Sequence, residues 1–231
     1  MHALALNPAA AIHAPQGTEW LALLPSYLLG AVPFGWVMAR LIRGVDLRTV
    51  GSGNIGATNA MRVLGRPLGV LAFLLDFGKG WVPAALFATW FARGGGESRA
   101  TLAVLCGAAA VCGHVWPVYL RFRGGKAVAT GCGAIAAIDP VVFLAGGLAW
   151  LATLVFSRYV SLASIAMGLA FPLCAWARLS AGRGGAALVA GTAVLTLLIL
   201  WRHRANLERI LSGTEPKAGR RAPAEKRESH V

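Results

Sequence analysis

The chain has 231 residues, of which 57% are apolar and only 13% are charged, and its 22 Lys and Arg against nine Asp and Glu give a net charge of +13. The charged share is about half that of ordinary soluble domains, which disfavours a soluble enzyme, a disordered chain and a secreted disulfide scaffold. A polytopic membrane protein remains. The positions of the basic residues then decide whether these residues bind a nucleic acid or orient the chain in a membrane.

Seven stretches in chain order are apolar enough to form membrane helices. They are residues 20–39, 67–92, 100–120, 127–138, 140–157, 159–177 and 184–201. Most are close to the ~20 residues with which a helix crosses ~30 Å of hydrocarbon. The stretch 127–138 is shorter, and a re-entrant or interfacial segment is its alternative. We therefore predict an all-α integral membrane protein with seven transmembrane helices.

The basic residues orient these helices. With the N-terminus outside, 17 of the 22 Lys and Arg fall in cytoplasmic segments and four fall outside. This bias follows the positive-inside rule and argues against nucleic acid as the partner. The prediction is an external tail at 1–18, a membrane domain at 19–213 and a cytoplasmic tail at 214–231.

The first cytoplasmic segment, DLRTVGSGNIGATNAMRVLG, is rich in glycine and polar side chains. Gly51 and Gly53 permit tight turns in which backbone N–H groups can bind an anion. The polar side chains beside them are Ser52, Asn54, Asn59 and Arg62. A phosphate site is the favoured interpretation, and a purely structural loop is the alternative.

The same segment matches the dinucleotide pattern GxGxxG, from Gly51 to Gly56. That pattern indicates dinucleotide binding when it follows a strand in a βαβ unit, whereas here it follows a predicted membrane helix. The context therefore disfavours a dinucleotide site.

The second cytoplasmic segment contains Gly124, Gly125 and Lys126 directly before a predicted helix. It is not a P-loop, because Leu120 and Ala127 stand where that motif needs Gly and Ser or Thr. A glycine turn, a helix N-terminus and a lysine together attract anions.

The remaining polar residues are spread over two cytoplasmic segments and one span. Ser161 and Ser164 share a helix face, either as caps or as ligand contacts. His203 and Asn206 also share a face, and Glu208 and Glu215 are expected to pair with nearby arginines. Within the second span, Asp76 and Lys79 are expected to pair, near its cytoplasmic end, because charges in a membrane are costly.

This inventory of Gly, Ser, Asn, Arg, Lys and His suits a phosphate-bearing substrate at the cytoplasmic face. It contains no carboxylate cluster for a metal and no His-x4-Asp acyltransferase motif. The four cysteines lie in apolar stretches without a CxxC pair, so we expect neither a metal nor a disulfide.

The segments GSGNIGATNAMRVLG, LDFGKG, GHVWPVYLRFRGGKAVAT, RYVSLAS and RHRANLERILSGTE, in this order, closely resemble the bacterial acyl-phosphate:glycerol-3-phosphate acyltransferase family, PlsY. The resemblance covers about residues 22–216. It implies transfer of a fatty acyl group from acyl phosphate to the 1-hydroxyl of sn-glycerol 3-phosphate, giving lysophosphatidic acid and phosphate. It also implies a multi-pass protein of the bacterial inner membrane that needs no cofactor and no obligate protein partner.

The resemblance carries specific roles onto this chain. Catalytic roles fall on Ser52, Arg62, His203 and Asn206, and Glu215 takes a structural one. Phosphate binding falls on the two glycine segments, at Gly51, Gly53, Asn54, Arg62, Gly124, Gly125 and Lys126. Further substrate contacts are predicted at Asn59, Lys79, Ser161 and Ser164.

Because the predicted cations can hold the phosphates of both substrates, we expect the acyl group to pass directly from one substrate to the other. An acyl-enzyme on Ser52 is the rival mechanism. The acyl tail is expected between the spans, in a pocket lined by Leu and Phe. The alternative function is an organophosphate transporter that uses the same anion-binding groups. It is disfavoured because the motifs cluster at one face.

Overall fold

The computed structural model describes residue 12 and residues 14–219, and every regular element in this part of the chain is helical. In chain order the elements are the 3-10 helix η2 (Gly17–Ala22), α1 (Leu23–Ala31), α2 (Phe34–Arg43), α3 (Ala57–Leu64), α4 (Arg66–Val82), the π-helical turn η3 (Pro83–Phe87), α5 (Ala88–Phe91), α6 (Glu97–Val115), the 3-10 turn η4 (Val118–Leu120), α7 (Val128–Ile138), α8 (Pro140–Ser157), α9 (Val160–Ser180), α10 (Ala186–Arg202) and α11 (Arg204–Leu211). The predicted all-α class is confirmed.

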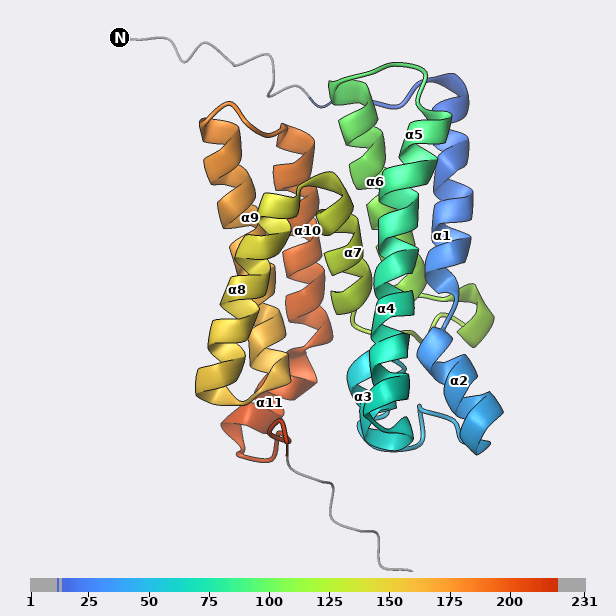
Figure 1. Cartoon of the computed structure of the whole chain (residues 1–231), viewed down its shortest axis with the longest axis vertical. Helices are drawn as coiled ribbons and strands as arrows, with labels where there is room; N and C mark the ends of the chain where they lie inside the picture. The colour runs from blue at the N-terminus through green and yellow to red at the C-terminus, as the bar shows by residue number, and fades with distance from the viewer. Residues whose placement is uncertain (1–11, 13, 220–231) are drawn as a thin grey trace, which may run out of the picture.

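The helices form one upright bundle (Figure 1). On one side α1 packs on α6, and on the other α8, α9 and α10 pack in sequence. The short α7 lies between these groups, against α4, α6 and α8. The short helices α2, α3 and α11 gather at one end of the bundle, opposite the end where the chain starts (Figure 1).

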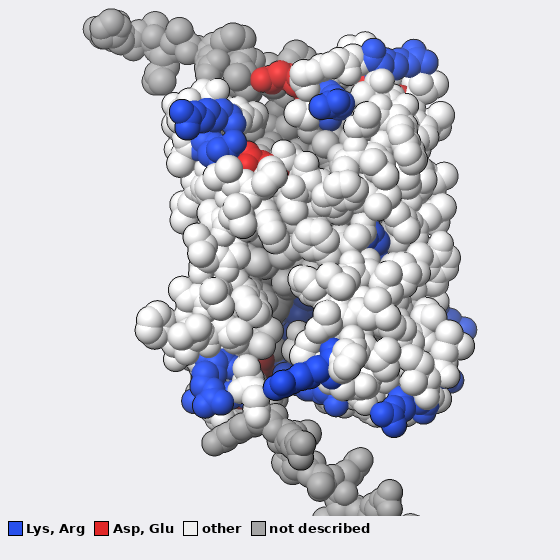
Figure 2. Space-filling view, in the orientation of Figure 1, with Lys and Arg blue, Asp and Glu red and all other residues white. Residues whose placement is uncertain are grey.

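Five helical segments of the described chain are long and apolar enough to cross a membrane, and α10 with α11 makes a sixth if the bent pair is one span. The fourth predicted span, residues 127–138, forms α7, which has 11 residues and rises only about 17 Å, too little to cross the membrane alone. Basic side chains lie mostly at the two ends of the molecule, and the broad band between them shows few charged atoms (Figure 2).

The first predicted span is not one straight helix. Residues 20–39 were expected as a single helix, but the chain breaks at Val32 and Pro33, between α1 and α2. Proline removes a backbone donor and disfavours a helical residue before it, which accounts for the break. Lys79 Nζ donates to the freed Val32 carbonyl at 2.7 Å.

Lys79 also pairs with Asp76 at 2.8 Å, and both side chains are almost fully buried. The pairing therefore agrees with expectation. The pair lies ten residues into α4, about 15 Å from the start of the helix, and so not at the end that the sequence predicts to be cytoplasmic.

Small residues let the central helices approach closely. A Cβ on Gly80 of α4 would lie 1.9 Å from the Thr130 carbonyl of α7, and one on Gly133 would lie 1.9 Å from the Phe77 carbonyl. This contact fixes α7, and with it the loop that precedes α7.

The folded region continues past residue 213. Glu215 is buried against α11, and the Ala218 backbone N–H donates to the Arg158 carbonyl at 2.7 Å. At the other end Gly17 and Thr18 belong to η2. Most of the predicted N-terminal tail and the last 12 residues of the C-terminal tail lie outside the described residues.

Candidate active site

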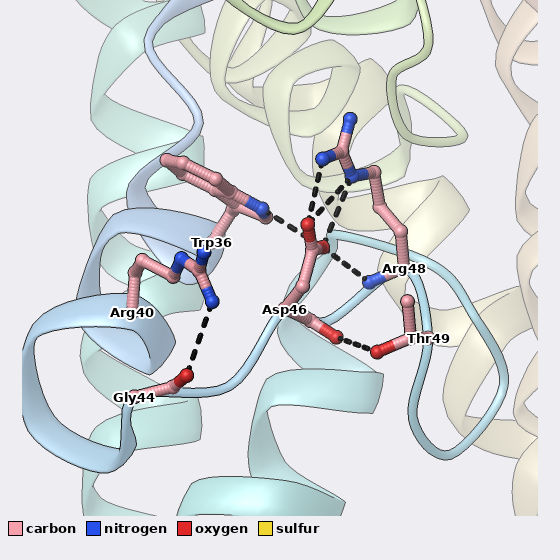
Figure 3. A network of polar contacts seen from close by, with 6 residues as sticks. All are labelled: Trp36, Arg40, Gly44, Asp46, Arg48 and Thr49. Atoms are coloured by element: carbon pink, nitrogen blue, oxygen red, sulfur yellow. Dashed lines mark hydrogen bonds and ion pairs between the residues drawn. The ribbon is translucent and has the colours of Figure 1, made fainter.

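Polar contacts of Asp46 hold the start of the loop between α2 and α3 in place (Figure 3). Asp46 Oδ1 accepts hydrogen bonds from Trp36 Nε1 and the Arg48 backbone N–H, each at 2.9 Å. Its Oδ2 pairs with Arg48 Nη2 at 2.6 Å. The Arg48 guanidinium holds the pKa of this carboxyl well below its usual range, so the Asp46 carboxylate stays ionised.

Asn59 of α3 holds the glycine-rich turn from inside. Its buried Oδ1 accepts from the Ser52 backbone N–H at 2.9 Å, and its Nδ2 lies 2.9–3.1 Å from the carbonyls of Leu47, Val50 and Asn54. A Cβ on Gly51, where φ is +62°, would lie 2.2 Å from Asn59 Oδ1. Both polar atoms of Asn59 are thus used by the loop, and its place in the site is to shape that loop.

The shaped loop leaves several polar groups open to solvent. Ser52 and Gly53 are exposed at its tip, and Asn54 Oδ1 accepts from the Gly56 backbone N–H at 2.8 Å. Arg62 is exposed one turn from the end of α3, with no hydrogen-bond partner among the described residues. These groups are therefore accessible to a ligand.

The second glycine segment is locked between α6 and α10. The backbone N–H groups of Gly124 and Gly125 donate to the carbonyls at the end of α6, at 3.1 and 3.0 Å. Arg202 of α10 donates from Nη2 to the Gly124 carbonyl at 2.9 Å and from Nε to the Gly125 carbonyl at 3.0 Å. A Cβ on Gly125 would lie 2.1 Å from His114 Nε2, so the imidazole packs directly on the glycine.

Lys126 begins a chain of polar contacts that ends at the surface. Its Nζ donates to Asn206 Oδ1. Asn206 Nδ2 donates to Glu215 Oε1 at 2.7 Å, and Glu215 Oε2 pairs with Arg209 Nε at 2.8 Å. The Glu215–Arg209 pair confirms the arginine contact expected for Glu215, whereas Glu208 forms no ion pair with the described residues. Although burial acts to raise it, the bonds from Asn206 and Arg209 keep the pKa of Glu215 below its ordinary value.

Cations from three other helical elements lie close enough to Lys126 to lower its pKa. Burial lowers its pKa to about 8, and the charges of Arg209, Arg202 and Arg62 act in the same direction against the opposing effect of Glu215. Because Arg62 belongs to α3, Arg202 to α10 and Arg209 to α11, the structure brings the separate polar segments together. Such a concentration of positive charge suits phosphate groups.

His203 lies at the break between α10 and α11, where the chain bends by 52°. Its Nδ1 is 2.9 Å from the Ile199 carbonyl, and the side chain is buried. Burial and the nearby Lys126 charge lower the pKa of His203 to about 4, so the ring is neutral at pH 7. A carbonyl can only accept, so Nδ1 carries the proton and Nε2 is left as a hydrogen-bond acceptor.

The three remaining predicted contacts differ in availability. Ser164 Oγ donates to the Val160 carbonyl of its own helix at 2.9 Å, and Lys79 is occupied by Asp76 and Val32. Ser161 Oγ is buried without a hydrogen-bond partner in the described part of the chain. Of the three, Ser161 is the one without a hydrogen bond, although its hydroxyl faces Glu215 and acts to lower the pKa of that carboxyl.

Sequence reasoning missed two residues that build the site. Arg202 is one of the 17 basic residues that the sequence places in cytoplasmic segments, and His114 lies in the apolar stretch 100–120, but the sequence assigns neither a place in the site. Nothing in the local sequence distinguishes them, because their contacts to the glycine segment join residues far apart in the chain. Among the described residues no group of three or more His, Cys, Asp and Glu could hold a metal ion.

Comparison with known proteins identifies the family. A family model described as glycerol-3-phosphate acyltransferase matches residues 20–213. The chain belongs to the glycerol-3-phosphate acyltransferase family. A glycerol-3-phosphate acyltransferase of Parasynechococcus marenigrum is 41% identical over 94% of this chain and 97% of its own length. One from Aquifex aeolicus is 44% identical over 82% of this chain and 94% of its own length.

Solved structures of PlsY, an integral membrane glycerol 3-phosphate acyltransferase, share the fold of this acyltransferase family member. The glycerol 3-phosphate form is 41% identical with a TM-score of 0.79, over 88% of this chain and 96% of that one. The lysophosphatidic acid form is 40% identical with a TM-score of 0.76, over 87% and 95%. The chain is accordingly a multi-pass membrane acyltransferase, as the resemblance implied.

Proposed function

We propose that this protein transfers a fatty acyl group from acyl phosphate to the 1-hydroxyl of sn-glycerol 3-phosphate at the cytoplasmic face of the bacterial inner membrane. The observation that carries the proposal is the convergence of Arg62, Arg202 and Arg209 around Lys126, beside two glycine-rich loops. Both substrates bear phosphate, and this cluster offers several cations to two anions at once. The excess of basic residues predicted for the cytoplasmic side supports the orientation.

The reaction needs positioning and charge stabilisation more than a strong base. The glycerol hydroxyl oxygen attacks the carbonyl carbon of the acyl phosphate, an ester bond forms, and the bond from that carbon to the phosphate oxygen breaks. Inorganic phosphate leaves, and the hydroxyl proton passes to a substrate phosphate, whose second pKa is near ~6. Arg62 stabilises the negative charge that develops in the transition state, and Lys126 binds the phosphate of glycerol 3-phosphate.

His203 has the protonation state to orient the acceptor. With Nδ1–H bonded to Ile199, the neutral ring presents Nε2 as an acceptor for the attacking hydroxyl. A neutral imidazole also avoids repelling Lys126, which Asn206 holds in place. His203 is therefore proposed to position the hydroxyl, and Asn206 to position Lys126.

Ser52 is proposed to bind phosphate and not to carry the acyl group. It lies exposed on a loop, and in the described structure its hydroxyl has no hydrogen bond to a His, Asp or Glu that could activate it. A serine nucleophile ordinarily needs such a base. Direct transfer is the mechanism that these contacts favour.

The test uses purified protein in lipid nanodiscs with palmitoyl phosphate. We expect release of inorganic phosphate that depends on glycerol 3-phosphate and matches lysophosphatidic acid formed. Intersecting initial-rate lines support direct transfer, whereas parallel ping-pong lines or a trapped acyl-Ser52 contradict it. Glycerol 3-phosphate uptake into vesicles without acyl transfer would establish the transporter instead.

Lys126→Ala separates binding from chemistry in the same assay. We expect the KM for glycerol 3-phosphate to rise by about 10- to 100-fold while kcat changes less, the pattern of a lost binding contact. An unchanged KM with a lost kcat would contradict this role.

A further inference from the structure

The break between α1 and α2 is held by one side chain of α4. Lys79 Nζ donates to the Val32 carbonyl at 2.7 Å and lies 5.7 Å from the centre of the ring of Phe34, the first residue of α2. Its charged partner is Asp76, at 2.8 Å, and both side chains of the pair are almost fully buried. Burying two charges costs desolvation energy, so such a pair is weak evidence for a role in stability. Its contact with the break between two helices points to a role in placing α2.

Helix α2 in turn holds the glycine-rich loop near both of its ends. Trp36 Nε1 donates to Asp46 Oδ1 at 2.9 Å where the loop starts (Figure 3). Gly35 packs directly on the other end, because a Cβ on this residue would lie 2.6 Å from the Ile55 carbonyl. A change in the direction of α2 would therefore move the loop, and with it Ser52.

A small change in that direction is enough to matter. Helix α2 has ten residues and is about 15 Å long, so a tilt of about 5° at the break displaces its far end by about 1 Å. A shift of about 1 Å in a catalytic group can lower activity about 100-fold.

We infer that Lys79 is a positioning residue, which fixes the direction of α2 and through α2 places the Ser52 loop and the adjoining Arg62. The sequence predicted a substrate contact at Lys79, and in the structure its Nζ is used by Asp76 and Val32. The inference rests on the proposed function and adds a residue outside the cationic cluster.

This role predicts a specific kinetic pattern. Arg62 acts on the charge of the transition state, so a displaced loop should lower kcat. The KM for glycerol 3-phosphate depends on Lys126 and should change little. The pattern is the opposite of the one expected for Lys126→Ala.

The main test removes both charges of the buried pair together. Asp76→Leu combined with Lys79→Met keeps similar side-chain volumes and leaves no unpaired charge, but it offers no donor to the Val32 carbonyl. In nanodiscs with saturating palmitoyl phosphate, kcat should fall by about tenfold or more, and the KM for glycerol 3-phosphate should change by less than about threefold. The conservative Lys79→Arg keeps a charged donor beside Asp76, so its kcat should lie between those of the double variant and the wild type.

A second variant moves α2 without touching the ion pair. Gly35→Ala places a methyl group 2.6 Å from the Ile55 carbonyl, so kcat should again fall with little change in KM. Gly78→Ala, beside Lys79 on α4, meets nothing within 4 Å and is the matched control, with the kcat of the wild type. Thermal unfolding in the same nanodiscs shows whether each variant folds, and Gly35→Ala carries the test if the double variant does not.

Trp36→Phe tests the route from α2 to the loop. It removes the donor to Asp46 Oδ1 and should also lower kcat. When it is combined with the double variant, the loss in transition-state stabilisation should be smaller than the sum of the separate losses, because both changes act through one loop.

Three outcomes would overturn the inference. The first is a wild-type kcat in the folded double variant or in Gly35→Ala. The second is a raised KM with an unchanged kcat, which would make Lys79 a substrate contact. The third is full additivity with Trp36→Phe. Failure of the proposed function looks different, because the wild-type protein would then transfer no acyl group from acyl phosphate.

Discussion

At the scale of single residues, Lys126 should make the enzyme sensitive to alkaline pH. Its pKa is lowered to about 8, so the free enzyme loses this positive charge as the pH rises through that value. Glycerol 3-phosphate is already a dianion there, because its second pKa is near ~6. We expect kcat/KM for glycerol 3-phosphate to fall above pH 8, by up to about tenfold per pH unit.

Lys126→Arg provides the control for this titration. A guanidinium stays charged throughout the accessible pH range, although it does not reproduce the geometry of an ammonium group. The variant should have lower activity but a flat profile between pH 7 and pH 10. The same alkaline decline in Lys126→Arg would show that another group titrates.

Glu215 should contribute to both activity and stability, although it lies near the C-terminus. Glu215→Ala removes the partner of both Asn206 Nδ2 and Arg209 Nε and so frees the residue that holds Lys126. A hydrogen bond to a charged group contributes about 1.5–3 kcal/mol, so kcat/KM should fall by about tenfold or more, with a lower thermal unfolding midpoint. Glu208→Ala, at an exposed position on α11, should leave both quantities unchanged.

At the scale of elements, the loop before α7 should tolerate no side chain at Gly125. The φ of this residue is not in the left-handed region, but a Cβ would meet the His114 ring at 2.1 Å. Gly125→Ala should displace the loop that carries Lys126, and a shift of about 1 Å in a catalytic group can lower activity about 100-fold. Initial rates with saturating acyl phosphate measure the effect.

The control for this steric effect uses open space elsewhere. Gly147→Ala on α8 meets nothing within 4 Å and should be as active as the wild type. His114→Ala combined with Gly125→Ala removes the ring that the methyl group meets, so the pair should recover part of the lost activity. A double variant less active than Gly125→Ala alone would point to another role for His114.

The helices also show which structural features sequence patterns can predict and which they cannot. Charge-free stretches correctly indicated α6, α8, α9 and α10, because each of these helices must match the hydrocarbon thickness. The same patterns could not predict that another helix contacts the chain at the break beside Pro33. The freed Val32 carbonyl is met by Lys79 from another helix, and that pairing is decided by packing.

At the scale of the whole molecule, the topology remains a prediction with a direct test. With the N-terminus outside, Gly95 lies at the outer end and Ser212 at the cytoplasmic end. A membrane-impermeant maleimide should label Gly95→Cys in intact cells, and label Ser212→Cys only after the membrane is opened. Gly95 has open space around it and Ser212 is exposed, so neither substitution should disturb the fold.

A reversed labelling pattern would place the cationic cluster outside the cytoplasm and contradict the proposed location of the reaction. The wild-type chain is the control, because its four free cysteines lie within the helices. Labelling of wild-type protein in intact cells would show that a helix cysteine is accessible, and the background would then need to be removed.

The sequence by itself determined that this protein is a helical membrane protein, which segments carry its polar chemistry and to which family it belongs. Hydrophobic length, the distribution of basic residues and long local motifs are written in neighbouring residues, so they can be read without the fold. Only the tertiary structure decided which of those residues meet: Lys126 with Asn206, Arg202 with the glycine loop, His114 with Gly125, and Asn59 with the inside of its own loop.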